Sequence, residues 1–266
     1  MAITIKDKVI WITGASSGIG EACAYQLAKE HACLILTARN TDKLTQISEK
    51  CIALGGTCKI LPYDLSDIEG IPALVKNALS LYGRIDIMYN NAGISQRAKA
   101  GDTLFEVDKK IMDLNFFAPV LITKLLLPEM IKNGGGTFVT TTSISGRFGF
   151  PLRSAYSSSK HALYGFFETV LAEYYNDNIR VVMVCPGRVK TNISFYALEQ
   201  NGKQHGQMDA GQAGGISSEK AAKKIVRAIQ KQKPEVLVGG KELLMVYFKR
   251  FIPALNRKLA RNIKPE

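Results

Sequence analysis

Two side chains four residues apart, Tyr156 and Lys160, have the types and spacing needed for proton transfer. If the segment around them is helical, they lie on one face of the helix, one turn apart. A phenol with its ordinary pKa of about 10 holds its proton too tightly for acid–base work near pH 7, and a positive charge beside it lowers that pKa. Such a pair could protonate a carbonyl oxygen or deprotonate an alcohol. The same spacing is also common on plain helix surfaces, so it needs support from other motifs.

A run of hydroxyl side chains, from Thr140 to Ser145, precedes this pair. One of these hydroxyls could hydrogen-bond a substrate oxygen, on which negative charge grows while hydride reaches the neighbouring carbon. The residue types alone leave open which hydroxyl would do so.

A glycine-rich segment near the N-terminus predicts a phosphate-binding turn. It follows a short apolar run, precedes a segment with helical spacing, and reads Thr13-Gly14-Ala15-Ser16-Ser17-Gly18-Ile19-Gly20. Glycines let the backbone approach a pyrophosphate, and the free amides and the dipole at a helix start attract the anion. A plain tight turn would also use glycines, and Gly-x3-Gly-x-Gly differs from the common Gly-x-Gly-x-x-Gly fingerprint.

The end of the next predicted strand bears on the choice of cofactor. NAD-binding sites usually carry an acidic residue here, which binds the ribose hydroxyls. This chain has Ala38 followed by Arg39. The lack of an acidic residue removes repulsion of a 2′-phosphate, and a guanidinium can donate paired hydrogen bonds to it. The pattern predicts NADP(H), unless Arg39 is merely a solvated loop residue.

The elements needed to position these motifs alternate along the chain. Apolar strands are predicted at 9–12, 33–37, 58–61, 85–89, 136–141, 181–185 and 236–238, and helices at 18–29, 41–54, 68–82, 107–131, 155–176 and 218–230. Strands that are apolar throughout indicate a parallel sheet covered on both faces. We therefore expect one α/β domain over 1–266, a Rossmann-like, doubly wound sheet of about seven strands. Ligands of such sheets bind beyond the carboxyl ends of the strands, where these motifs lie.

Taken together, the motifs resemble the short-chain dehydrogenase/reductase family over roughly residues 6–238. The TGASSGIG loop, Asn90-Asn91-Ala92-Gly93, Asn115, Ser143, Tyr156-x3-Lys160 and Pro186-Gly187 follow one another in the family's order and at similar spacing. The resemblance implies that Tyr156 is the general acid and base, and that Lys160 lowers its pKa and holds the nicotinamide ribose. It implies that Ser143, thirteen residues before Tyr156 as in the family, binds the substrate oxygen, with Ser145 as second choice.

The resemblance also implies a role for Asn115 and a cofactor site built from several loops. Asn115 would kink its helix around a proton-relaying water, or its side-chain amide would simply hydrogen-bond to neighbouring residues. Asp64 would bind the adenine amino group or cap a helix, and Asn90 would support its turn. The set expected to hold NADP(H) is Gly14, Ser16, Ser17, Gly18, Ile19, Gly20, Arg39, Asp64, Leu65, Asn91, Ala92, Gly93, Tyr156, Lys160, Pro186, Gly187, Val189 and Thr191. No metal-ligand set is expected.

Two segments fall outside this pattern. Residues 191–217 are expected to form a substrate lid with Phe195 and Tyr196 as apolar contacts, or a mobile loop with no fixed role. Residues 241–266 combine seven Lys or Arg and two Asp or Glu with many apolar side chains, and Pro253 should break any helix there. This basic, helical segment could pack on the domain or on a neighbouring subunit, or lie on an anionic membrane surface.

Composition limits the partners. The net charge is +12, but the chain shows no nucleic-acid-binding signature, so no nucleic-acid partner is expected. The apolar runs at 9–12 and 181–185 are too short to span a bilayer, no secretory signal is visible, and five cysteines fit reduced thiols. We therefore expect a cytoplasmic protein.

The family resemblance implies a homodimer or homotetramer formed through helices 107–131 and 155–176; the alternative is that the apolar stripes of these helices belong to the core. In overall arrangement the chain resembles the branch that acts on steroids, retinoids and other lipids, so the expected substrate is a small carbonyl or alcohol, with lipid-like carbonyls as candidates. The alternative is a dinucleotide-sensing binding protein, because a fold does not fix chemistry. The presence of Ser143, Tyr156, Lys160 and Asn115 favours an enzyme.

Overall fold

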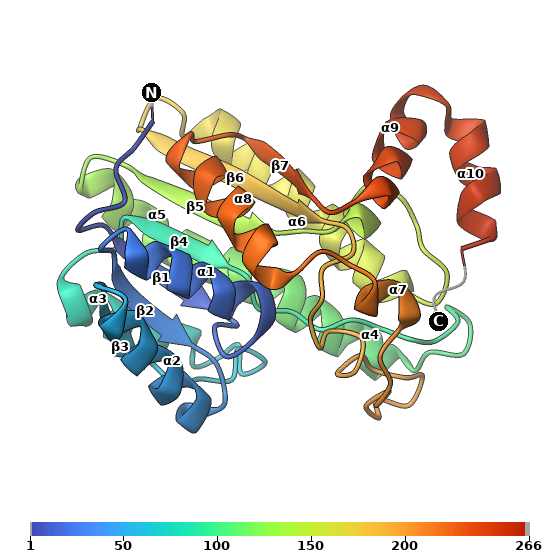
Figure 1. Ribbon diagram of the computed structural model, residues 1–266, viewed down its shortest axis with the longest axis horizontal. Helices are drawn as coiled ribbons and strands as arrows, with labels where there is room; N and C mark the ends of the chain where they lie inside the picture. The colour runs from blue at the N-terminus through green and yellow to red at the C-terminus, as the bar shows by residue number, and fades with distance from the viewer. Residues whose placement is uncertain (1, 264–266) are drawn as a thin grey trace.

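A computed structural model describes residues 2–263, and its strands form one parallel sheet (Figure 1). The strand order is β3-β2-β1-β4-β5-β6-β7. In this register, Trp11 of β1 lies opposite Ile35 of β2 on one side and Met88 of β4 on the other. The strands are β1 (Val9–Thr13), β2 (Cys33–Thr37), β3 (Thr57–Ile60), β4 (Ile87–Asn90), β5 (Gly136–Thr141), β6 (Ile179–Pro186) and β7 (Glu235–Val238).

The strand order creates the point at which such sheets bind ligands. The chain steps outward from β1 to β3, then crosses back to β4 and continues to β7. The loops after β1 and β4 therefore diverge and leave a crevice between them. These loops are the glycine-rich segment and Asn91-Ala92-Gly93. The predicted doubly wound α/β fold is confirmed.

Helices cover both faces because side chains of a strand alternate between the faces of a sheet. Ile10 and Ile12 pack in one buried cluster with α1 (Gly18–Lys29), α2 (Thr41–Ala53) and α8 (Ser218–Gln230). Val9 and Trp11 pack in the other, with α3 (Ile71–Tyr82), α5 (Ala118–Lys132) and α6 (Ser154–Glu173). The predicted start of α3 at residue 68 is three residues early, because Gly70 precedes the first turn and Pro72 lies within it.

The predicted helix 107–131 is interrupted near its middle. α4 (Phe105–Met112) passes through a π-helical turn, Asp113–Phe117, into α5. Asn115, where the resemblance implied a kink, lies in this turn, and π turns are frequent at functional sites. By length and composition alone the run Phe105–Lys132 could cross a membrane, contrary to the expectation from short apolar runs. In this fold it contacts α3 and α6.

The two irregular segments both contain helices. The expected lid includes α7 (Ala210–Ala213), and its Leu198 packs against Val107 and Ala155. The C-terminal segment forms α9 (Leu244–Phe251) and α10 (Pro253–Arg261), so the chain breaks its helix at Pro253 as predicted. Figure 1 shows α9 and α10 as a pair on the opposite side of the molecule from α2.

Candidate active site

The glycine-rich turn has the geometry of a phosphate cradle. Gly14 and Gly18 have φ of 63° and 61°, which side chains rarely allow. A Cβ atom on Gly14 would lie 2.7 Å from Cα of Ala92, and one on Gly20 would lie 2.3 Å from the carbonyl oxygen of Gly14. The Ser17 side chain does not cap α1, so the first amides of this helix remain available to an anion.

A cleft of about 880 Å³ opens above this turn, between the loops after β1 and β4. Its volume is in the range of cofactor pockets, and its residue types fit a nicotinamide dinucleotide. Gly20, Tyr156, Lys160, Pro186, Gly187 and Val189 do not line it. The predicted cofactor residues that do are Gly14, Ser16, Ser17, Gly18, Ile19, Arg39, Asp64, Leu65, Asn91, Ala92, Gly93 and Thr191.

Arg39 and Asp64 face each other at one end of the cleft. Nη1 of Arg39 lies 4.0 Å from Oδ2 of Asp64, and the Arg39 side chain is 74% exposed. Oδ1 of Asp64 accepts hydrogen bonds from the amide and the hydroxyl of Ser66, at 3.0 and 2.8 Å. Asp64 therefore stabilises a turn rather than capping a helix. An exposed ion pair of this kind contributes about 0–1 kcal/mol, so the Arg39 guanidinium is free to reorient.

The turn after β4 is held by Asn91 rather than by Asn90, the residue expected to support it. Nδ2 of Asn91 donates to the carbonyl oxygens of Thr13 and Gly14, each at 3.2 Å, and its Oδ1 accepts from the hydroxyl of Thr141 at 3.1 Å. The Asn90 side chain is buried, and its amide atoms have no hydrogen-bond partner among the described residues. Asn91 thus ties the phosphate turn to β5 while it lines the cleft.

Ser143 is the hydroxyl that meets the phenol of Tyr156. Both side chains are buried, and the Ser143 hydroxyl lies near enough to the phenol to lower the pKa of Tyr156. Oγ of Ser143 also accepts from the amide of Ser145 at 3.1 Å, so the start of the following turn fixes its position. Of the two candidate serines, the structure places Ser143 against Tyr156.

The charges around Tyr156 differ from the expectation. Burial raises the pKa of Tyr156, while the nearby Ser143 hydroxyl and the positive charges of Arg153 and Arg97 lower it in part. Lys160 lies on the same side of α6, with Nζ 5.8 Å from the centre of the Tyr156 ring. Burial lowers the pKa of Lys160 to about 7. In the protein without nucleotide, Arg153 and Arg97 rather than Lys160 are the cations that lower the pKa of Tyr156, because a buried lysine loses part of its charge near neutral pH. The effect of Lys160 on Tyr156 in the complex with nucleotide stays a prediction.

Asn115 lies next to this group on the side of the loop after β4. Its Oδ1 accepts from the amide of Ile94 at 2.9 Å, and its Nδ2 donates to the Ile94 carbonyl oxygen at 2.9 Å and to Oγ of Ser159 at 3.1 Å. A Cβ atom on Gly93 would lie 3.0 Å from Oδ1 of Asn115 and 3.4 Å from Nζ of Lys160. The structure thus brings the side chains of Asn115 and Lys160 close to the same side of Gly93.

The segment after β6 is held from two directions by residues that the sequence did not single out. Oε1 of Glu242 accepts from the amide of Arg188 at 2.7 Å, and a Cβ atom on Gly187 would clash with this carboxylate. Nε2 of Gln212, in the lid, donates to the carbonyl oxygen of Val189 and to Oγ1 of Thr191. The lid and the C-terminal segment therefore both fix the turn expected beside the nicotinamide.

A dinucleotide-sized crevice at the switch point of the sheet, with a buried serine, tyrosine and lysine beyond it, defines a class of nicotinamide-dependent oxidoreductases. The chain belongs to the short-chain dehydrogenase/reductase family. The family model described as short chain dehydrogenase matches residues 8–202. A dehydrogenase/reductase SDR family protein 7-like from Drosophila melanogaster is 38% identical over 252 residues, which cover 93% of this chain and 77% of that protein.

Solved structures agree with this family assignment. A metagenomic short-chain oxidoreductase in complex with NADP is 27% identical, with a TM-score of 0.73, and the match covers 89% of this chain and 98% of that one. A short-chain dehydrogenase/reductase from Burkholderia phymatum in complex with NAD shares the fold, with a TM-score of 0.83 at 20% identity over 99% and 98% of the two chains. The neighbours bind NAD or NADP, which supports a nicotinamide dinucleotide as cofactor.

Proposed function

We propose that the protein is an NADP(H)-dependent oxidoreductase that interconverts a carbonyl compound and a secondary alcohol, with lipid-like carbonyls among the candidates. The observation that carries the proposal is that the buried Ser143 hydroxyl lies next to the Tyr156 phenol and lowers its pKa, with Lys160 beside the tyrosine ring. A buried acid next to a second hydroxyl donor suits an oxygen that must gain a proton as hydride arrives at its carbon.

Each of the four residues has its own part in this reaction. The Tyr156 phenol donates the proton during reduction and accepts it during oxidation, and Ser143 donates a hydrogen bond to the substrate oxygen. A reduced nicotinamide, when bound, supplies the hydride. Lys160 donates to the ribose, and in its charged form it favours the tyrosinate that proton transfer leaves behind. Asn115 holds the π turn and the Ile94 backbone against the site, and completes a polar path toward Lys160.

NADP(H) is proposed over NAD(H) because of the residues at the end of β2. Ala38 presents no carboxylate to repel a 2′-phosphate. Arg39 lines the cleft, is mostly exposed, and is held only weakly by Asp64. Its guanidinium can therefore turn toward a phosphate at little cost.

The competing proposal is a binding protein that senses dinucleotides without turning over a substrate. It would need the cleft, but it would not need a Ser143 hydroxyl placed beside the Tyr156 phenol. The test is reduction of a panel of aldehydes and ketones by purified protein with NADPH. Turnover of at least one member supports the enzyme; tight NADPH binding with no turnover of any member favours the sensor.

We further propose that the chain is cytoplasmic and assembles as a dimer or tetramer. Large apolar side chains stay exposed on the helices expected at the interface, namely Phe105 and Phe117 near α4 and Tyr175 after α6. Exposed large apolar side chains on these helices suit a contact with a second copy of the chain. Sedimentation or light scattering of the purified protein distinguishes a monomer from these assemblies.

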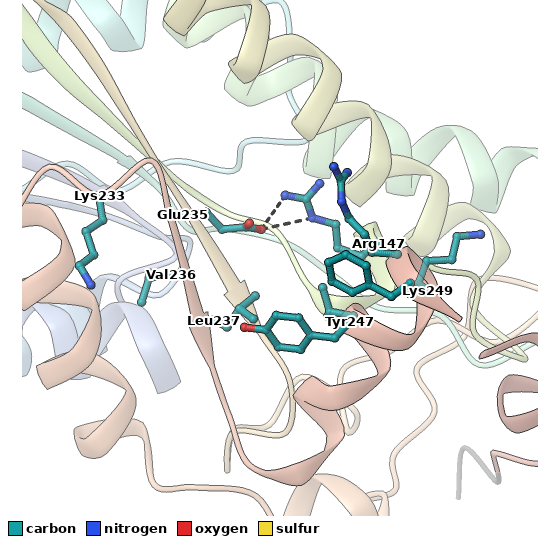
Figure 2. A pocket seen from close by; sticks show the side chains of 10 residues that line it. Arg147, Lys233, Glu235, Val236, Leu237, Tyr247 and Lys249 are labelled. Carbon is teal, nitrogen blue, oxygen red and sulfur yellow. Dashed lines mark hydrogen bonds and ion pairs between the residues drawn. The ribbon is translucent and has the colours of Figure 1, made fainter. Parts of the chain in front are cut away.

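Contact with an anionic membrane surface is a second proposal, carried by α9 and α10. A groove of about 1080 Å³ lies between β7 and α9, and it is lined by the ion pair of Arg147 and Glu235. Tyr247 and Lys249 of α9 line the same groove (Figure 2). Phe251 is 74% exposed at the end of α9. Large exposed apolar side chains and five cations on two adjacent helices suit a lipid headgroup region.

A further inference from the structure

A buried cluster of two arginines and one aspartate joins the lid to the start of the helix that carries Tyr156. Nε of Arg97 donates to Oδ1 of Asp209 at 3.2 Å, and its Nη2 donates to Oδ2. Nη2 of Arg153 donates to the same Oδ2 at 3.1 Å. Arg97 follows β4, Arg153 precedes α6 and Asp209 precedes α7, so three distant segments meet at one carboxylate.

The cluster contains two positive charges and one negative charge, so its net charge is +1. Guanidinium groups stay protonated in proteins, so two cations share the single Asp209 carboxylate. The side chains of Arg97 and Asp209 are only 2% and 3% exposed, and no other carboxylate within residues 2–263 forms an ion pair with either arginine. An uncompensated buried charge is costly unless a ligand compensates it.

Arg153 is the arginine with free donors. Nη1 of Arg97 donates to Oγ of Ser95 at 2.9 Å and to the Gln96 carbonyl oxygen at 2.6 Å, so Arg97 is bound on all sides. Nε of Arg153, by contrast, is buried without a hydrogen-bond partner among the described residues. The Arg153 side chain is 17% exposed, against 2% for Arg97, so Arg153 is the more accessible of the two arginines.

Arg153 lies close to the place where the proposed substrate oxygen would bind. It is three residues before Tyr156, at the N-terminus of the same helix. Burial and the charge of Arg97 lower the pKa of Arg153 to about 10, and the charges of Arg153 and Arg97 in turn act on the Tyr156 phenol. A substrate held by Tyr156 and Ser143 would therefore bring its neighbouring groups within reach of the free Arg153 donors.

We propose that Arg153 binds an oxyanion of the substrate, and that the substrate is a carbonyl compound or secondary alcohol that also bears a carboxylate or a phosphate. This inference rests on the proposed oxidoreductase function and names the substrate class of the same site. Asp209 holds the guanidinium in place from the lid side, and the surplus charge attracts the anion. Charge-assisted hydrogen bonds to a guanidinium are among the strongest polar contacts in proteins.

The test compares matched anionic and neutral ketones in NADPH-dependent reduction. One pair is 4-acetylbenzoate and its methyl ester; the other is 4-acetylphenyl phosphate and 4-methoxyacetophenone. We expect the wild type to prefer the anion by about tenfold or more in kcat/KM in at least one pair, and the larger preference identifies the oxyanion. Arg153→Gln should bring the ratio close to unity, and Arg153→Lys should retain part of it. Because the readout is a ratio, a general loss of activity cancels.

Arg227→Gln is the matched control, since it removes one exposed cation from α8 and should leave the preference unchanged. A wild-type ratio near unity, or a ratio equal in wild type and Arg153→Gln, overturns the inference while the proposed function stands. If no ketone is reduced, the proposed function fails, and calorimetric binding of 4-acetylbenzoate to the NADPH complex decides the inference separately. Affinity about tenfold weaker in Arg153→Gln supports the Arg153 site; equal affinity overturns it.

Discussion

The side-chain oxygen of Gln96 accepts a hydrogen bond from the backbone amide of Tyr156 at 3.4 Å. The same oxygen accepts from the amide of Ala155 at 2.9 Å, and Nε2 of Gln96 donates to the hydroxyls of Thr103 and Ser154. Arg153, the residue before α6, does not cap this helix with its own side chain. A residue from the loop after β4 therefore caps the helix of Tyr156, and it fixes the position of the phenol relative to the cofactor cleft.

Gln96→Leu should weaken both the fold and the reaction. The change leaves two buried backbone amides without an acceptor, and each unpaired amide lowers the free energy of unfolding by up to about 3 kcal/mol. We expect a lower free energy of unfolding and a fall in kcat, with NADPH affinity retained, because Gln96 does not line the cleft. Urea unfolding, steady-state kinetics and nucleotide titration measure the three quantities. Gln96→Glu keeps the acceptor and should recover most of kcat; equal loss in both variants would contradict a capping role.

Lys160 should make stability depend on pH in the absence of nucleotide. Burial lowers the pKa of Lys160 to about 7 in the folded state, from 10.5 in the unfolded chain. Between these values the unfolded chain binds the extra proton, so the free energy of unfolding rises with pH. Relative to Lys160→Met, the wild type should gain about 1–2 kcal/mol between pH 7 and pH 8.5. Urea unfolding of both proteins at the two pH values checks this; parallel pH profiles would mean that Lys160 titrates normally.

Arg39→Ala should lower the affinity for NADPH about tenfold or more and leave that for NADH nearly unchanged. The physical reason is that only NADPH carries the 2′-phosphate that the guanidinium would bind. Nucleotide fluorescence titration at matched ionic strength measures both affinities, with Arg227→Ala as a control for net charge. A wild type that prefers NADH, or equal losses for both nucleotides, would remove Arg39 from cofactor selection.

Full-length protein should float with vesicles that contain anionic lipid and not with neutral vesicles. Phe251→Glu combined with Leu255→Glu should abolish flotation, because both side chains are exposed on α9 and α10 and the change reverses their preference for a lipid interface. Point changes are preferable to truncation, since Leu243 and Val246 pack against the buried Phe148. Glu219→Gln on α8 serves as the control. Flotation that persists in the double variant would point to another surface.

Much of the fold could be predicted because local sequence patterns indicate each strand and most of the helices. The apolar runs, the glycine turn and Pro253 all fall where local rules put them. The resemblance implies a kink at Asn115, but the π turn itself is not predicted, because no local pattern marks it. Helices α7, α9 and α10 lie in segments whose polar or mixed composition gives a weaker pattern.

The site was harder to predict because its support comes from contacts between distant segments. Gln96 lies 59 residues from the amide that it caps, and Asp209 lies 112 residues from Arg97. Gln212 and Glu242 contact the turn after β6 from the lid and the C-terminal segment. The charge state of Lys160 depends on burial, which spacing alone does not give. An arginine three residues before Tyr156, at the start of the same helix, is a sequence signal that points to the charge beside the phenol.

The central claim is that the Tyr156 phenol moves the proton at the reacting oxygen. The most direct measurement is kcat for NADPH-dependent reduction of the best ketone in the panel by wild type and Tyr156→Phe, together with NADPH affinity. We predict that kcat falls by about 10²-fold or more while NADPH affinity stays the same, because the change removes only the hydroxyl group. Equal kcat in the two proteins would contradict the assignment and remove Tyr156 from the reaction.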